Sequence, residues 1–264
     1  MNRILNQIVF ISLLILNVSC SKQKKENNLS ETQNKSKVVK DEISLFQENH
    51  ADPTEKSISI GKVNEGEIIN ACLLPFFGEN FSYFSKESYL AQRAFIHCDI
   101  KNILISSFTL IKNKIPNRRF YIMEASNEKG GKISPHRTHQ NGTSIDLMVP
   151  LKKDNIPYIE LDTIGIDHYL LQFTNKGEYS ENYSIQIDFD ALAQEILAIQ
   201  TTAVKNGWKI DKVILKTELQ SLLFKSNYKN ELIDSDIYFT KKLENIINDL
   251  HDDHIHIDFK KTNN

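Results

Sequence analysis

This chain of 264 residues has no excess of positive charge, and it contains little cysteine, proline or glycine. The net charge is −2, whereas a nucleic-acid-binding domain is usually strongly basic, so we expect no nucleic-acid partner. Glycine and proline number only 9 and 6, and 40 % of the residues are hydrophobic, which is enough for an ordinary globular core. None of the 3 cysteines has a metal-ligand spacing to a histidine, and no serine or cysteine has the surroundings of an activated nucleophile.

The N-terminus has the pattern of an export signal. Residues 1–3 are polar with one positive charge, and the apolar run over 4–16 is too short for a comfortable membrane span. Ser19 then precedes Cys20, which resembles the cleavage and lipidation site of bacterial lipoproteins. We expect residues 1–20 to be a lipoprotein-type signal peptide. An ordinary signal peptide with a chance cysteine is the alternative.

Composition divides the remainder into a tether and a folded domain. Residues 21–57 are rich in Lys, Glu, Asn, Ser and Gln and have few large apolar side chains, so they cannot bury enough surface to offset the entropy of ordering. We expect a disordered tether there and one folded domain over 58–264. Within it, Cys72 and Cys98 either form a disulfide, as is common in exported proteins, or remain as two buried thiols.

Hydrophobic periodicity predicts both helices and strands in this domain. Helical spacing predicts helices over 99–112, 190–206 and 235–250, with Asp190 as the N-cap of the second. Short apolar or alternating runs predict strands, which cover 120–123, 145–149, 183–189, 209–216 and 254–259. Because these elements follow no regular βαβ rhythm, we expect an α+β fold with a mixed or antiparallel sheet.

Two distant stretches hold five of the eight histidines. Residues 134–146 contain His136 and His139 and end at Asp146, whereas residues 251–258 contain three more histidines. Histidine is a common metal ligand and acts as an acid or base near neutral pH. Clustering of this kind is hard to explain by core packing, so we expect the two stretches to meet in one site.

The second stretch alternates strictly between polar and apolar residues. In a strand, His254, His256 and Asp258 share one face, while Ile255 and Ile257 enter the core.

A catalytic zinc site usually has three protein ligands. His139 and Asp146 suit a turn from a loop into a strand, and His256 is the natural third ligand. His254 lies about 7 Å along the strand from His256. It could therefore act as a general base toward water beside the metal.

These residues resemble a known family. Gly130-Gly131, the run His-Arg-Thr-His-Gln-Asn-Gly over 136–142, Asp146, and the run His-Asp-Asp-His-Ile-His over 251–256 look like the penicillin-insensitive murein endopeptidases. These are zinc peptidases related to lysostaphin-type enzymes and D-alanyl-D-alanine peptidases. Outside the two motifs the similarity is loose, and the cysteine framework of the best-known members is missing.

The resemblance implies a fold, a cofactor and residue roles. It implies a central antiparallel sheet that carries the metal site and is flanked by helices, with Zn2+ held by His139, Asp146 and His256. His136 matches a family histidine near the metal that serves either a second metal or the substrate. His251 and His254 match positions implicated in catalysis or in holding the transition state.

The implied activity is cleavage of the D-alanyl to meso-diaminopimelyl cross-links of peptidoglycan. The expected partners are peptidoglycan and, through lipidated Cys20, a membrane, which places the protein in the periplasm as a lipid-anchored metallopeptidase. Two alternatives stay open: a D,D- or L,D-carboxypeptidase acting on stem peptides, and a non-catalytic lipoprotein that binds the cell wall and retains the metal.

Overall fold

The structure, a computed structural model, describes residues 42–262, so the predicted signal peptide and Cys20 lie outside the described residues. Residues 42–49 are helical, and a compact unit runs from Leu45 to Asn264. The tether predicted over 21–57 therefore extends too far at its C-terminal end. The ring of Phe46 lies 4.2 Å from that of His50 and 5.5 Å from that of Tyr89, and composition alone does not show such contacts.

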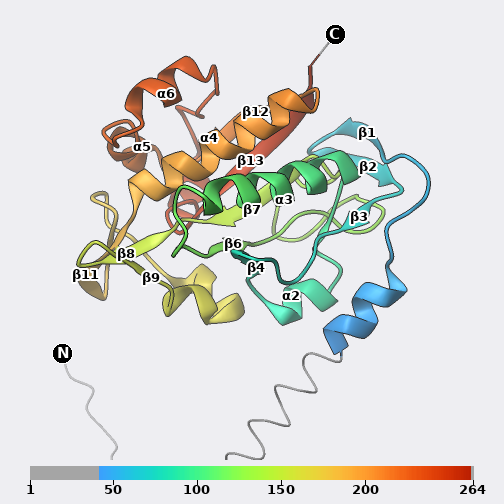
Figure 1. Cartoon of the computed structure of the whole chain (residues 1–264), viewed down its shortest axis with the longest axis horizontal. Coiled ribbons are helices and arrows are strands. Elements are labelled where there is room, and N and C mark those ends of the chain that lie inside the picture. Colours follow the sequence, from blue (N-terminus) through green and yellow to red (C-terminus); the bar gives the residue numbers. More distant parts are fainter. Residues whose placement is uncertain (1–41, 263–264) are drawn as a thin grey trace, which may run out of the picture. The chain divides into compact units, whose positions relative to one another are not determined.

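A five-stranded sheet forms the centre of this unit (Figure 1). Its order is β12 (Trp208–Ile214), β13 (His254–Lys261), β7 (Ser144–Met148), β6 (Phe120–Ile122) and β4 (Phe81–Tyr83). All neighbours pair antiparallel except β4 and β6, which are parallel. The α+β fold with a central, mainly antiparallel sheet is therefore confirmed.

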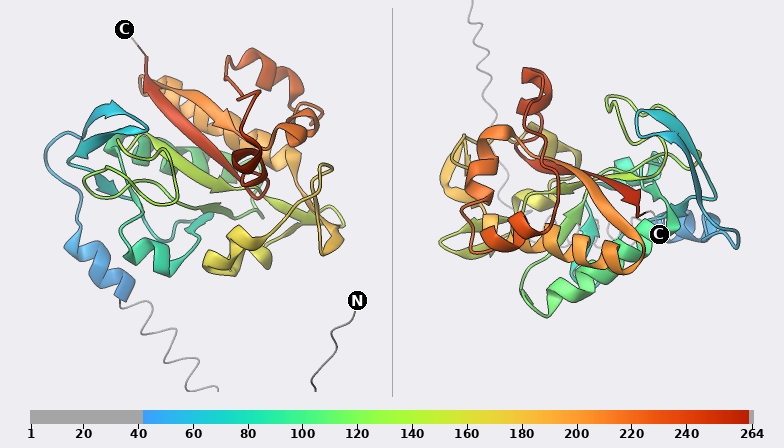
Figure 2. Two further views of the ribbon diagram at one scale, coloured as in Figure 1. Left: turned by 180° about the vertical axis from the view of Figure 1, so that it is seen from behind. Right: turned by 90° about the horizontal axis from the view of Figure 1, so that it is seen from above.

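Two long helices, α3 (Cys98–Lys112) and α4 (Phe189–Lys205), lie over one face of this sheet (Figures 1 and 2). Both were expected from their apolar spacing, and their buried positions recur at that spacing, as in Ile196 and Ile199 of α4. The N-cap of α4 differs from the expectation. Asp188 accepts from the backbone N–H of Ala191 at 3.2 Å, whereas the carboxylate of Asp190 accepts from Asn227.

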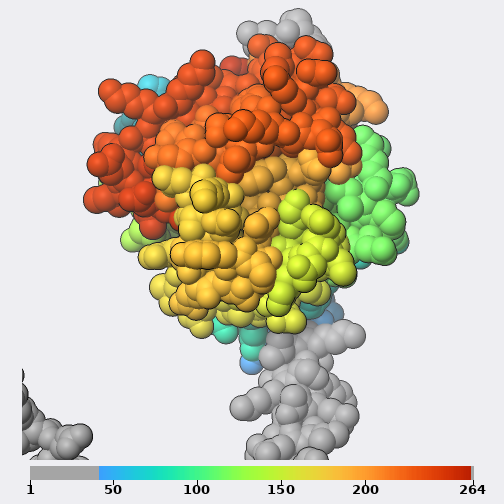
Figure 3. All heavy atoms as spheres, turned by 90° about the vertical axis from the view of Figure 1, so that its left-hand side faces the viewer, coloured from blue at the N-terminus to red at the C-terminus, as the bar shows by residue number. Residues whose placement is uncertain are grey.

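Smaller elements surround this core. An antiparallel sheet has the order β10 (Glu178–Tyr179), β11 (Asn182–Ile187), β8 (Leu151–Lys153) and β9 (Ile156–Tyr158). Figure 3 views the molecule from its side, with the yellow and gold residues of this region below the orange and red C-terminal segments. The remaining short elements are β1 (Ile58–Lys62), β2 (Glu65–Ile69), β3 (Cys72–Leu73), β5 (Phe95–Ile96), α2 (Lys86–Leu90), η1 (Leu161–Thr163) and η2 (Gly165–Leu170).

The long helix predicted over 235–250 is wrong. Within this range the chain forms an irregular segment followed by the short α7 (Asn245–Asp249), and two short helices, α5 (Thr217–Leu223) and α6 (Lys229–Asp234), precede it. Val213 on the edge strand β12 donates its N–H to Tyr238 O and accepts from Thr240 N, at 2.9 and 3.0 Å. These backbone groups are used by the sheet edge, so residues 238–240 cannot continue a helix.

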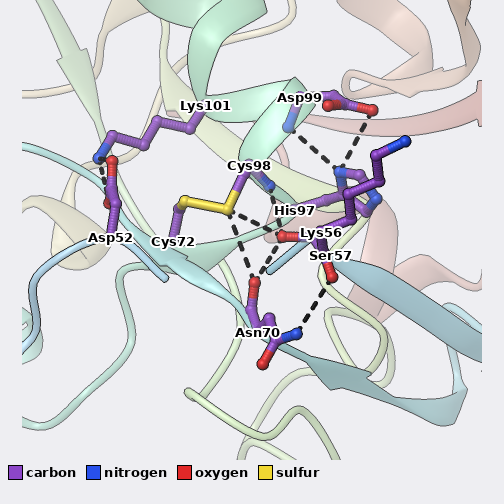
Figure 4. The surroundings of a disulfide bond; sticks show 9 residues. All are labelled: Asp52, Lys56, Ser57, Asn70, Cys72, His97, Cys98, Asp99 and Lys101. Atoms are coloured by element: carbon purple, nitrogen blue, oxygen red, sulfur yellow. Dashed lines mark hydrogen bonds and ion pairs between the residues drawn. A yellow bond between two sulfur atoms is a disulfide. The ribbon is translucent and has the colours of Figure 1, made fainter. Parts of the chain in front are cut away.

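Cys72 and Cys98 form a disulfide, which decides between the two possibilities left by the sequence (Figure 4). The bond joins β3 to the first residue of α3. Beside it, the Ser57 hydroxyl accepts from Cys98 N at 3.0 Å, and His97 caps α3 by accepting from Asp99 N at 3.2 Å. His97 therefore has a structural role.

No helix among residues 42–262 is long and apolar enough to cross a bilayer.

Candidate metal centre

The two histidine stretches meet because β13 pairs directly with β7. In the antiparallel register His256 lies opposite Asp146, although the two residues are 110 positions apart in the chain. Nδ1 of His256 lies 2.8 Å from Oδ1 of Asp146. Both side chains are almost fully buried, and both line the same cavity.

His139 joins this pair from the loop that precedes β7. Its backbone is in the left-handed region, with φ of 67°, and its side chain is completely buried. Nε2 of His139 lies 3.2 Å from Oδ1 of Asp146 and 3.1 Å from Nδ1 of His256. The sides of this triangle are therefore 2.8, 3.1 and 3.2 Å. Tetrahedral zinc ligands at ordinary bond lengths are separated by roughly 3.3 Å, so the three atoms have the spacing of one coordination sphere.

His136 approaches the same carboxylate from the other side. Its Nδ1 lies 3.5 Å from Oδ2 of Asp146, and its ring stands 4.8 Å from that of His139. Ligand atoms of His136, His139 and Asp146 all lie within 4.8 Å of one another, so this group could hold a metal ion. The structure therefore brings together the three residues expected as zinc ligands and His136, which was expected near the metal.

One unpartnered buried oxygen supports a cation beside the triangle. In the part of the chain that the structure describes, Oδ2 of Asp146, which faces Nδ1 of His136 at 3.5 Å, has no hydrogen-bond partner. Nδ1 of His139 also lacks a partner there, but it is not an atom of the triangle. The three atoms of the triangle can all act as electron-pair donors, and a cation between them would satisfy all three. The donor set of imidazole nitrogens and one carboxylate fits a zinc ion.

The charges of the surrounding side chains also favour a cation at this centre. Burial alone would raise the pKa of Asp146, but His139 and His256 hold it well below its usual range. Burial lowers the pKa of His139. Burial also opposes a charge on His256, yet Asp258 and Asp146 raise its pKa to about 9. The centre is therefore built to hold positive charge between two carboxylates, and a bound metal would replace the proton of His256.

Glu124, which the sequence analysis did not single out, orients His136. Its Oε2 lies 2.6 Å from Nε2 of His136 and accepts from Arg93 at 2.9 Å, while Oε1 accepts from Ser88 at 2.8 Å. The backbone N–H of Asp146 donates to Glu124 O at 2.8 Å, which holds Glu124 beside β7. With Nε2 of His136 facing Glu124, Nδ1 faces Asp146 and is free to bind a cation. A lone Glu after a short strand carries no local pattern that could have identified it.

His254 lies beside the metal group without being part of the triangle. Its Nδ1 is 2.5 Å from Oδ1 of Asp253, and this carboxylate raises the pKa of His254 against the opposing effect of burial. The ring of His251 lies 4.8 Å from that of His254, and burial, followed by the charge of His254, lowers the pKa of His251 to about 3. His251 is therefore neutral, and its Nδ1 faces Ile247 O at 2.6 Å.

Two further residues near the second stretch have structural contacts. His168 is completely buried behind Asp253, with its ring nitrogens 3.1 Å from Leu161 O and 3.3 Å from Asp253 O. Asp252 accepts from the backbone N–H of Phe173 at 3.1 Å. Neither residue belongs to the metal group.

The centre opens into a cavity of about 830 Å³. Glu124, Asp146, His136, His251, His254 and His256 contribute polar groups to its wall. Ile166, Ile214, Leu243, Ile247 and Leu250 contribute apolar ones. Arg137 and Glu244, both largely exposed, form an ion pair of 3.1 Å across two segments of the wall. A cavity with mixed walls and convergent polar groups is typical of a substrate site.

No protein-family model matches this chain, and no curated protein matches its sequence. The geometry brings together a group that could bind a metal ion, a histidine held by a carboxylate, and a large cavity.

Proposed function

We propose that this protein is a zinc-dependent endopeptidase that cleaves peptide cross-links of peptidoglycan, of the D-alanyl-meso-diaminopimelyl type. The observation that carries the proposal is the triangle of His139 Nε2, Asp146 Oδ1 and His256 Nδ1, with sides of 2.8 to 3.2 Å. Two of its residues, Asp146 and His256, line a large cavity. The murein endopeptidase motifs supply the substrate class, because the same residues that carry the resemblance form the triangle.

The protein residues around the triangle have distinct tasks in this proposal. His139, Asp146 and His256, with His136 beside them, would hold a zinc ion, which when bound would supply Lewis-acid chemistry toward a peptide carbonyl and water. Asp253 engages Nδ1 of His254, which leaves Nε2 to accept a proton from water and to donate it to the departing amine. His251, neutral beside it, can hydrogen-bond to the reacting groups without adding a second charge.

We further propose that the protein acts in the periplasm, anchored to a membrane through lipidated Cys20. Ser19-Cys20 after a short apolar run supports this location. Metabolic labelling with a fatty-acid analogue tests it, since labelling should require Cys20 and disappear in Cys20→Ser.

Purified, zinc-loaded protein tests the activity directly. We expect it to split cross-linked dimeric muropeptides into monomers, to lose activity with a chelator, and to be unaffected by β-lactams. His139→Ala should abolish both zinc binding and cleavage, and undiminished cleavage by that variant would contradict the proposal.

Release of terminal D-alanine from monomers with dimers left intact would indicate a carboxypeptidase. Binding of peptidoglycan without any new amino terminus would indicate a non-catalytic wall-binding protein.

A further inference from the structure

The hydroxyl of Tyr169 is buried at the cavity wall and has no hydrogen-bond partner among residues 42–262. The buried tyrosines nearby are different. The hydroxyl of Tyr83 donates to Arg93 O at 3.0 Å, and that of Tyr89 donates to Leu74 O at 2.6 Å. A buried hydroxyl without a partner costs free energy, so an unpaired one beside a functional group requires an explanation.

The ring of Tyr169 is held firmly in place. It packs edge-on against the ring of His254, with centroids 5.9 Å apart, and against that of Phe84 at 5.6 Å. The preceding residue, His168, fixes η2 by placing its two ring nitrogens near Leu161 O and Asp253 O. The hydroxyl is therefore presented by a fixed element.

The surroundings keep this hydroxyl protonated. Burial raises the pKa of Tyr169 well above its usual value, and the negative charges of Glu124 and Asp146 raise it further. Asp146 belongs to the metal group, and Glu124 contacts His136 beside it. The hydroxyl is thus kept as a hydrogen-bond donor on a ring that packs against His254 and lines the cavity.

We propose that Tyr169 is a catalytic residue whose hydroxyl donates a hydrogen bond to the carbonyl oxygen of the scissile peptide as that oxygen gains negative charge. The proposal rests on the peptidase function proposed above. Donors fixed before the reaction stabilise a developing oxyanion without reorganising. Removal of one such donor typically lowers kcat by roughly 100- to 1000-fold.

Tyr169→Phe tests the proposal, with Tyr89→Phe as its matched control. Tyr169→Phe removes a hydroxyl that bonds to no protein atom in the described chain, so Tm and zinc content should stay unchanged while kcat on dimeric muropeptide falls at least 100-fold and KM changes little. Tyr89→Phe removes a hydroxyl bonded to Leu74 O and does not line the cavity, so Tm should fall while kcat is retained.

A binding measurement keeps this proposal separate from the peptidase function. Calorimetric titration of acetohydroxamate into zinc-loaded protein should show an affinity roughly 10-fold weaker in Tyr169→Phe than in wild type, because a charge-assisted hydrogen bond is lost. If wild type cleaves and the variant keeps its kcat, the role of Tyr169 is refuted. The role of Tyr169 is also refuted if kcat of the variant falls only together with its Tm and its zinc content. If wild type does not cleave but the affinity still falls, the peptidase function fails while the donor role toward an oxyanion stands. If wild type does not cleave and the two proteins bind acetohydroxamate equally well, both the peptidase function and the donor role of Tyr169 are refuted.

Discussion

The ring of His256 faces a different carboxylate with each of its nitrogens. Nε2 lies 2.7 Å from Oδ1 of Asp258, whereas Nδ1 lies 2.8 Å from Oδ1 of Asp146. Asp258 is itself fixed, because it accepts from Ser144 at 2.6 Å and pairs with Lys212 at 2.8 Å. Asp258 therefore holds the Nε2 proton and orients the ring, which leaves Nδ1 to bind a metal.

Asp258→Asn should weaken zinc binding. Loss of the carboxylate behind a ligating histidine typically lowers metal affinity by about 10- to 100-fold. Competition against a chromophoric chelator measures the affinity. Asp211→Asn is the control, because Asp211 pairs with exposed Lys260 on the neighbouring strand and should leave zinc affinity unchanged. Equal affinities for both variants would mean that Asp258 does not support His256.

Glu124→Gln should lower both the free energy of unfolding and the affinity for zinc. A neutral amide cannot replace a carboxylate that contacts Arg93, Ser88 and His136, so we expect a loss of about 2 kcal/mol in the free energy of unfolding. Zinc affinity should fall about 10-fold, because His136 loses the group that orients it. Glu87→Gln, the same substitution at an exposed position on the cavity wall, should change neither quantity. Unaltered zinc affinity in Glu124→Gln would exclude His136 as an oriented ligand.

A buried charge cluster that does not line the cavity should govern part of the pH dependence of stability. Arg118, Asp162 and Glu195 are each at most 3 % exposed, and both carboxylate oxygens of Glu195 lack a partner among the described residues. Burial raises the pKa of Asp162 to about 7, although Arg118 opposes the shift. Burial also raises the pKa of Glu195 well above its usual value, again against Arg118 and helped by Asp162.

The sign of the effect follows from the proton balance. Between pH 4 and about 7 the unfolded chain ionises Asp162 while the folded protein keeps it protonated, so the free energy of unfolding falls as pH rises through this window. One such group contributes a slope of at most about 1.4 kcal/mol per pH unit. Asp162→Asn should reduce this slope, and Asp167→Asn, an exposed neighbour, should not. Urea unfolding at several pH values gives the slopes, and parallel curves for wild type and Asp162→Asn would contradict the assignment.

The disulfide should stabilise the domain without affecting the metal centre. Cys72 and Cys98 are separated by 26 positions, and closing a loop of this length typically contributes about 3 kcal/mol. The double variant Cys72→Ala/Cys98→Ala should lose this amount in urea unfolding while retaining wild-type zinc affinity. Reductant should destabilise wild type to a similar extent and leave the double variant unchanged. A double variant as stable as wild type would show that the bond does not contribute.

Local sequence patterns correctly predicted the helices that pack one face against the sheet along their whole length. The apolar spacing of α3 and α4 placed both helices to within one residue of their ends, because each packs one continuous stripe against the sheet. The segment 235–250 has similar apolar residues, but its backbone pairs with the edge of β12 at residues 238–240. A long-range backbone pairing of this kind overrides local propensity and leaves no trace in local spacing.

The sequence alone determined the types of the candidate metal ligands and the strand face that carries His256. Strict alternation over 254–258 placed His254, His256 and Asp258 together, since successive strand residues point to opposite faces. Only the tertiary structure decided the rest: the register that sets His256 against Asp146, the Glu124 carboxylate behind His136, and the unpaired Tyr169 hydroxyl beside His254. Register and side-chain contacts depend on how distant segments pack. A single sequence records which groups are present but not which of them meet.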